Sequence, residues 1–152
     1  MANAIKWVAG TAYSTAIDGT ASGLRNMAND ARVIGAAIDN ATAKDQKAAF
    51  ELYVDMASAP SANGAFNLYL IYSLDGTNFA NGDASVVPAP NTLKLVFPVQ
   101  PNTNQQRIVL ADVDIAPFKF KCLLENKSGQ ATTNANDTDN ILSYATYNSE
   151  IQ

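Results

Sequence analysis

The segment Asn67–Gly82, with the sequence NLYLIYSLDGTNFANG, decides the fold. It begins with the apolar run Leu68–Tyr72, which is too short for a helix of ordinary length and is rich in the aromatic and branched residues that suit a pleated surface. Two turn signals follow, Asp75-Gly76 and Asn81-Gly82. Because side chains on both faces of the run are apolar, we predict an interior strand of a structure with two β layers.

Two further segments, Phe50–Met56 and Phe118–Glu125, alternate between apolar and polar residues. In the first, the apolar side chains face one way, whereas Glu51 and Asp55 face the other. In the second, the pattern predicts inward-facing Phe118, Phe120, Cys122 and Leu124 and outward-facing Lys119, Lys121 and Glu125. A period of two residues is typical of a strand that is buried on one face only.

The rest of the chain contains further short strand patterns separated by turn residues. We predict these strands at Ala4–Tyr13, Ala31–Ile38, Leu93–Phe97, Arg107–Ile115 with a bend at Ala111-Asp112, and Ile141–Tyr147. The region Ile17–Ala43 mixes helical spacing with glycines, and we predict a short turn or helical piece around Ser22–Met27. Ser128–Asn140 is predicted to be a long polar loop.

Short strands with turn residues between them are typical of a β-sandwich or barrel. The expectation is therefore an all-β, jelly-roll-like β-sandwich of about eight strands, with at most a short helical turn near residues 22–27. The chain has 152 residues, which fits a single domain covering residues 1–152. Residues 1–13 are a candidate N-terminal arm of this domain.

Composition limits the classes of partner. The net charge is −4 and only 16% of residues are charged. Nucleic-acid binding usually needs the opposite sign, because affinity comes from neutralising phosphates, so no direct nucleic-acid partner is expected. No secretory signal and no membrane-spanning run are recognised, so no membrane partner is expected either.

The single cysteine, Cys122, rules out an intramolecular disulfide and is predicted to be a buried apolar residue.

Catalytic patterns are missing from the sequence. There is no histidine, which removes the commonest general base and the commonest transition-metal ligand. Two carboxylate pairs, Asp112/Asp114 and Asp137/Asp139, have spacings that acid–base chemistry or calcium could use, but solvated polar faces explain such pairs far more often. We therefore expect no enzyme, no catalytic residues, no cofactor and no metal site.

The N-terminal strand contains Ile5 and Trp7, the only tryptophan. Trp7 has two interpretations, a core anchor or an aromatic contact to a partner, and the core is favoured. A terminal strand can also pair with a neighbouring subunit, because its edge is open. Ile5 and Trp7 are therefore the candidate interaction residues.

Several pieces of the chain together resemble one family, the small tailed-bacteriophage virion proteins of the head-decoration or cement type. These pieces are Leu24–Thr42 (LRNMANDARVIGAAIDNAT), Phe50–Asp55 (FELYVD), Asn67–Gly82, Phe118–Ala131 (FKFKCLLENKSGQA) and Ile141–Ile151 (ILSYATYNSEI). The resemblance implies a non-enzymatic protein on the capsid exterior, made in the host cytoplasm. It also implies the major capsid protein as partner and a homo-oligomer, with a trimer favoured.

An alternative is a carbohydrate- or receptor-binding β-sandwich module of a phage tail. The sequence YSLDGTNF, within Asn67–Gly82, is similar to a turn in discoidin-like glycan-binding domains. Exposed aromatic residues would be the expected binding groups, because they stack on sugar rings. A hydrolase is a third interpretation, ranked below both because the sequence offers no obvious base.

Overall fold

The computed structural model describes residues 5–151, with the side chains of residues 7–149. This part of the chain contains nine β-strands in two antiparallel sheets. The strands are β1 (Ile5–Ala9), β2 (Ser14–Ile17), β3 (Arg32–Ile38), β4 (Lys47–Val54), β5 (Ala65–Ser73), β6 (Leu93–Pro98), β7 (Gln106–Asp114), β8 (Lys119–Asn126) and β9 (Ile141–Ile151). One short α-helix, α1 (Asn40–Ala43), and one 3₁₀ turn, η1 (Pro90–Thr92), complete the described elements.

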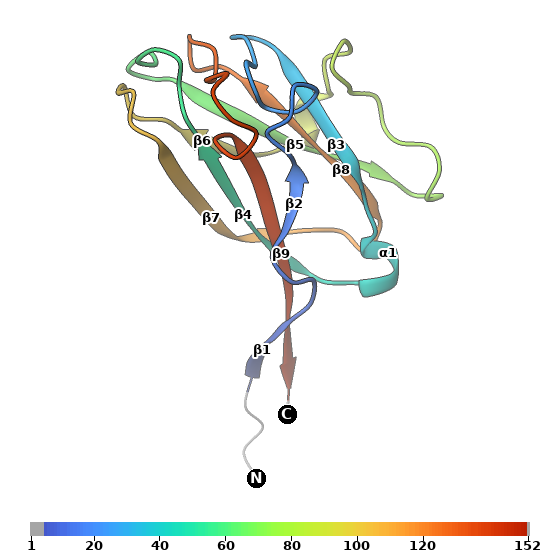
Figure 1. Ribbon diagram of the computed structural model, residues 1–152. Helices are drawn as coiled ribbons and strands as arrows, with labels where there is room; N and C mark the ends of the chain where they lie inside the picture. The colour runs from blue at the N-terminus through green and yellow to red at the C-terminus, as the bar shows by residue number, and fades with distance from the viewer. Residues whose placement is uncertain (1–4, 152) are drawn as a thin grey trace.

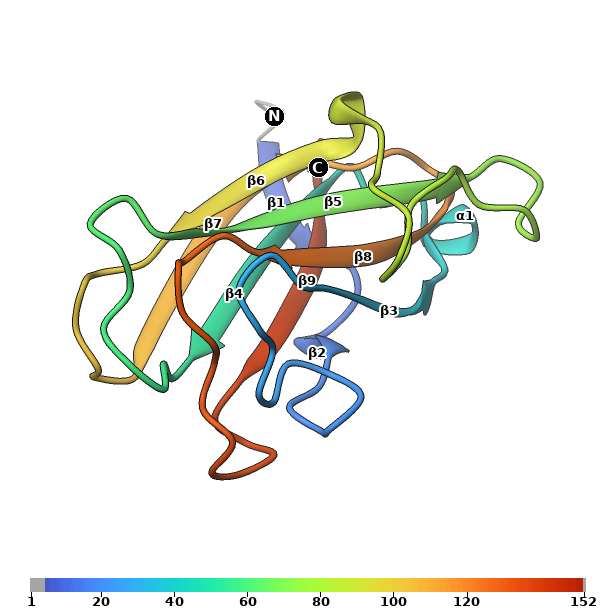
Figure 2. The ribbon, with the colours of Figure 1, turned by 90° about the horizontal axis from the view of Figure 1, so that it is seen from above.

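The two sheets stack face to face and cross at an angle (Figure 2). Sheet A has the order β1–β9–β4–β7, with β2 also paired to β9, and sheet B has the order β3–β8–β5–β6. Since β1 and β2 pair with different parts of β9, they act as two pieces of one edge strand. When β1 and β2 are counted as one strand, each sheet has four strands, and their order is that of a jelly roll. The predicted fold class is therefore confirmed.

Strand β5 lies inside sheet B, between β8 and β6, as the opening segment predicted. Its alternate residues Phe66, Leu68 and Leu70 are fully buried in the core between the sheets. Ile71 points to the opposite face and is buried as well, because Gly82 and Pro88 of the following loop pack close to it. The apolar residues on both faces of this strand are therefore explained by the core on one side and the chain's own loop on the other.

The predicted strand over Ala4–Tyr13 is instead interrupted after β1. At the break the chain bonds to Thr146, which accepts from Gly10 N at 2.9 Å and, through Oγ1, from Thr11 N at 2.7 Å. A Cβ atom at Gly10 would lie within 2.5 Å of the carboxylate of the buried Asp45. The strand is broken here because the backbone passes directly over a buried side chain, which local sequence patterns do not reveal.

The segment near 22–27, predicted to be a short turn or helical piece, is a turn without helix. Its amides bond irregularly: Leu24 N donates to Asp18 O rather than to the carbonyl four residues back, and Asn26 has a φ of 54°. The short helix lies instead at Asn40–Ala43. Asp39 caps it, because its side chain accepts from the amides of Ala41 and Thr42.

The bend predicted at Ala111-Asp112 is confirmed as a β-bulge. The register between β4 and β7 shifts at this point, and Asp112 has a φ of 62°.

The loop over Ser128–Asn140 was expected to be simply polar, yet Ser128, Thr132 and Asn140 are buried. Polar side chains of this loop therefore serve as internal hydrogen-bonding partners.

Glu125 was predicted to face solvent and is instead only 5% exposed. Its carboxylate accepts from Tyr69 at 3.0 Å and from Asn67 at 3.3 Å, and its Oε1 lies 3.3 Å from Arg32 and 3.5 Å from Lys127. Desolvation raises the pKa of Glu125, but the hydrogen bonds from Tyr69 and Asn67 and the charge of Lys127 outweigh it, so the pKa is lowered. The side chain is on the predicted face, but its neighbours cover it.

We expect Cys122→Ser to lower the free energy of unfolding by about 1–2 kcal/mol, because it places a hydroxyl in an apolar layer. Cys122 has no exposed surface, and burial raises the pKa of its thiol. Urea denaturation of both proteins measures the difference. Unchanged stability together with lost binding activity would contradict this structural role and point to a reactive thiol.

Candidate functional site

A two-stranded ribbon projects from the sandwich (Figure 1). It consists of β1 and Asn148–Ile151 of β9, and is called the terminal ribbon below. The pairing of β1 with β9 runs from Ile5↔Ile151 to Ala9↔Tyr147, whereas the pairing of β4 with β9 stops at Lys47↔Tyr147. Within residues 5–151, the ribbon therefore has no paired strand beyond β1 on one side or beyond Asn148–Ile151 on the other.

Trp7 lies in this ribbon and is 65% exposed. Its ring packs edge-on against Tyr147, with ring centroids 5.3 Å apart. The favoured interpretation of Trp7 as a core anchor was therefore wrong. The reason is register: Trp7 is paired with Ser149, past the end of β4, where the sandwich no longer provides a core. Ile5 is in β1 by its backbone, but its side chain is outside the described part.

The outer face of sheet A, which continues from the ribbon, is rich in tyrosine. Tyr13 is 65% exposed and lies over the sheet, where its hydroxyl donates to Glu51 Oε1 at 2.7 Å. The guanidinium of Arg107 stacks 5.0 Å from the ring centroid of Tyr53. Tyr147 accepts a hydrogen bond from Asp112 N at 2.8 Å. In contrast to sheet B, where the loop after β5 packs on Ile71, this face displays its aromatic side chains.

A hollow of about 260 Å³ lies between Tyr13 and Tyr53. It is called the tyrosine hollow below, and it is lined by Tyr13, Thr15, Glu51, Tyr53, Arg107, Thr138, Ile141 and Ser143. Strand register explains this grouping, since Thr15 is opposite Ser143, Ser143 is opposite Glu51, and Tyr53 is opposite Arg107. The side chain of Glu51 is only 16% exposed, and Arg107 Nε lies 3.7 Å from its Oε1.

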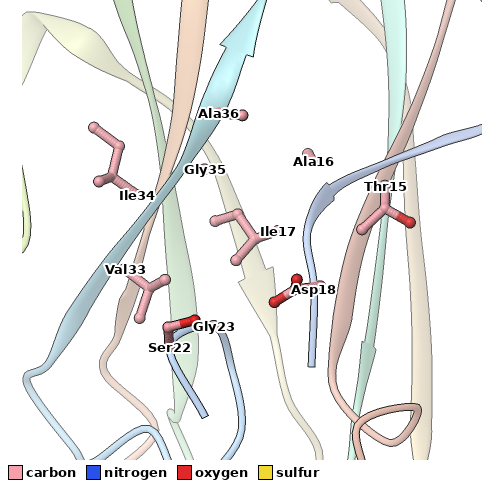
Figure 3. A pocket seen from close by; sticks show the side chains of 10 residues that line it. All are labelled: Thr15, Ala16, Ile17, Asp18, Ser22, Gly23, Val33, Ile34, Gly35 and Ala36. Atoms are coloured by element: carbon pink, nitrogen blue, oxygen red, sulfur yellow. The ribbon is translucent and has the colours of Figure 1, made fainter. Parts of the chain in front are cut away.

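A second hollow, of about 460 Å³, lies where the edge strands β2 and β3 of the two sheets approach each other (Figure 3). A Cβ atom at Gly35 would lie 2.1 Å from Ala16 O, so only glycine permits this close approach. Asp18 is the only titratable residue in the lining, and its Oδ1 already accepts from the amide and hydroxyl of Thr20. This hollow therefore offers no pair of groups for acid–base chemistry.

The carboxylate pairs noted in the sequence are engaged in ion pairs or hydrogen bonds. Asp112 and Asp114 both contact Lys47 Nζ, at 3.3 Å and 2.8 Å. The hydrogen bond to Lys47 lowers the pKa of Asp114. Asp137 pairs with Arg25 at 2.6 Å, and Asp139 accepts from a neighbouring amide side chain. In the part of the chain described here, no cluster of three or more acidic, cysteine or histidine side chains could hold a metal ion.

Sequence reasoning named the ribbon residues but missed the tyrosine hollow. The alternation of β4 does place Glu51 outward, which was predicted. Tyr13 lies in an irregular segment between β1 and β2, so no periodic pattern indicates its position over β4. The opposition of Tyr53 and Arg107 depends on the register between β4 and β7, which the sequence does not reveal.

Among residues 5–151, no helix has the length and apolar character needed to cross a membrane. No family model matches the chain, and no curated protein shows significant similarity to it.

Proposed function

We propose that this protein is a structural virion protein that binds the outside of an assembled phage capsid and stabilises it. The partner is the major capsid protein, the protein acts as a homo-oligomer with a trimer favoured, and it performs no chemistry of its own. The family resemblance of its sequence segments points to this role. The structural observation that carries the proposal is the terminal ribbon with its exposed Trp7.

The ribbon is suited to contact another protein through its strand edges. A two-stranded ribbon on its own is only marginally stable in water, and open strand edges are sites where another chain can add a strand. Main-chain hydrogen bonds then supply affinity, and side chains such as Trp7 supply specificity. A large aromatic side chain that is exposed in the free protein gains most when a partner covers it.

Stabilisation of the shell follows from the same contact. A subunit that binds the assembled shell better than separate capsid proteins shifts the equilibrium toward the assembled state. Many copies bind one shell, and within an oligomer each bound copy raises the effective concentration of the next. Weak individual contacts therefore add up to strong reinforcement.

The test is to mix the purified protein with undecorated, expanded capsids of the parent virus and to sediment them. We expect saturable co-sedimentation, and decorated capsids should withstand higher temperature than undecorated ones. Unexpanded shells are the control, since their capsid proteins are arranged differently. If the protein binds no form of the shell, the proposal is wrong.

A further inference from the structure

We propose that the tyrosine hollow on sheet A is a binding site for a neutral pyranose sugar. The hollow is separate from the terminal ribbon, and the proposal does not depend on shell binding. Its volume of about 260 Å³ is that of a shallow site for a small ligand rather than for a protein segment. The lining combines aromatic rings, hydroxyls, one carboxylate and one guanidinium.

The polar groups of the hollow form a row across the sheet. Thr15, Ser143 and Glu51 are directly opposite one another on β2, β9 and β4. Neighbouring strands are about 4.8 Å apart, so the row spans roughly 10 Å, the length of one to two linked sugar rings. Hydroxyls both donate and accept hydrogen bonds, and a carboxylate accepts two or more. Ser143 is only 2% exposed, so the exposed Thr15 and the half-buried Glu51 on either side of it are the groups of this row that the hydroxyls of a sugar would reach.

The two charged groups of the hollow orient each other. Glu51 Oε1 accepts from the Tyr13 hydroxyl and lies 3.7 Å from Arg107 Nε, whereas Oε2 accepts no hydrogen bond from the described residues. The Arg107 guanidinium is held against the Tyr53 ring, which reduces the freedom it would lose on binding. One carboxylate and one guanidinium give no net charge, so the site favours an uncharged ligand with many hydroxyls over an anion or a cation.

Tyr13 supplies the apolar part of the recognition. Its ring is 65% exposed, and it forms one wall of the hollow while its hydroxyl is anchored to Glu51. A pyranose has an apolar face of C–H groups that packs on an aromatic ring, and a polar rim of hydroxyls. An anchored ring beside a row of hydrogen-bonding groups provides both surfaces at once.

The experiment screens the labelled protein on an array of neutral and acidic oligosaccharides. It then titrates the best neutral sugar, together with the methyl glycosides of glucose, galactose and mannose, by calorimetry. We expect saturable binding of a neutral sugar. Glu51→Gln and Tyr13→Ala should each weaken it at least tenfold, because the first replaces a charged acceptor oxygen with an NH₂ donor and the second removes the stacking wall. Thermal melts establish that both variants are folded.

Val109→Ala is the matched control. Val109 is exposed on the same face, opposite Glu51 in the pairing of β4 with β7, but it lines a neighbouring hollow and not the tyrosine hollow, so its truncation should change sugar affinity less than twofold. Three outcomes would overturn the assignment: no neutral sugar binds, only acidic sugars bind, or folded Glu51→Gln and Tyr13→Ala proteins bind as well as the original.

Discussion

Trp7→Ala should weaken the proposed binding to the capsid about 30-fold. Trp7 is the aromatic side chain of the terminal ribbon and is 65% exposed, and it is positioned by its edge-on contact with Tyr147. Truncation of a tryptophan at the centre of an interface costs about 2 kcal/mol or more, which corresponds to that loss of affinity. Quantitative co-sedimentation with expanded capsids over a range of protein concentrations measures the change.

Leu74→Ala provides the comparison for Trp7→Ala. Leu74 is 79% exposed and lies in the loop that follows β5, outside the terminal ribbon. The Leu74→Ala variant, like Trp7→Ala, loses exposed apolar surface, but its affinity for the capsid should stay within twofold of the original. The two variants should unfold at denaturant concentrations close to that of the original protein, because neither residue is in the core. Equal losses of affinity in both variants would remove the ribbon from the proposed interface.

Asn126→Ala should lower the free energy of unfolding by about 3 kcal/mol, a large share of the ~5–15 kcal/mol that stabilises a typical domain. Asn126 has no exposed surface. Its amide nitrogen donates to Met27 O at 3.0 Å and to Gln130 O at 2.8 Å. Its oxygen accepts from the amide and the hydroxyl of Ser128 at 2.9 Å and 2.6 Å. Alanine would remove all four bonds and leave the buried Ser128 amide without a partner, whereas Met27 O and Gln130 O each keep one bond, from Thr132 N and Ser128 Oγ.

Urea denaturation at equilibrium measures the loss. Asn91→Ala is a suitable control, because Asn91 is exposed in η1 and its substitution should change stability by less than about 0.5 kcal/mol. If Asn126→Ala is as stable as Asn91→Ala, water must replace the lost hydrogen bonds. The Asn126 side chain would then not be what holds together the loops that meet there.

Part of the architecture could be predicted because it depends on local periodicity. Strands β4 and β8 alternate with a period of two residues, and their inward positions Phe50, Leu52, Phe120 and Cys122 are all buried. The bulge at Ala111-Asp112 was also indicated by the sequence. The region Ile17–Ala43 was harder to interpret, because small residues weaken the periodic signal and the short α1 depends on a single cap at Asp39.

By itself, the sequence determined the all-β class, the interior position of β5 and the inward faces of the alternating strands, because these follow from which residues must leave water. It also shows that the chain contains no histidine. Only the tertiary structure decided whether Trp7 is buried, whether Glu125 meets solvent and whether Tyr13, Glu51 and Arg107 meet. These outcomes depend on where one strand ends relative to another and on which loop covers which face, and both are set by contacts between residues far apart in the chain.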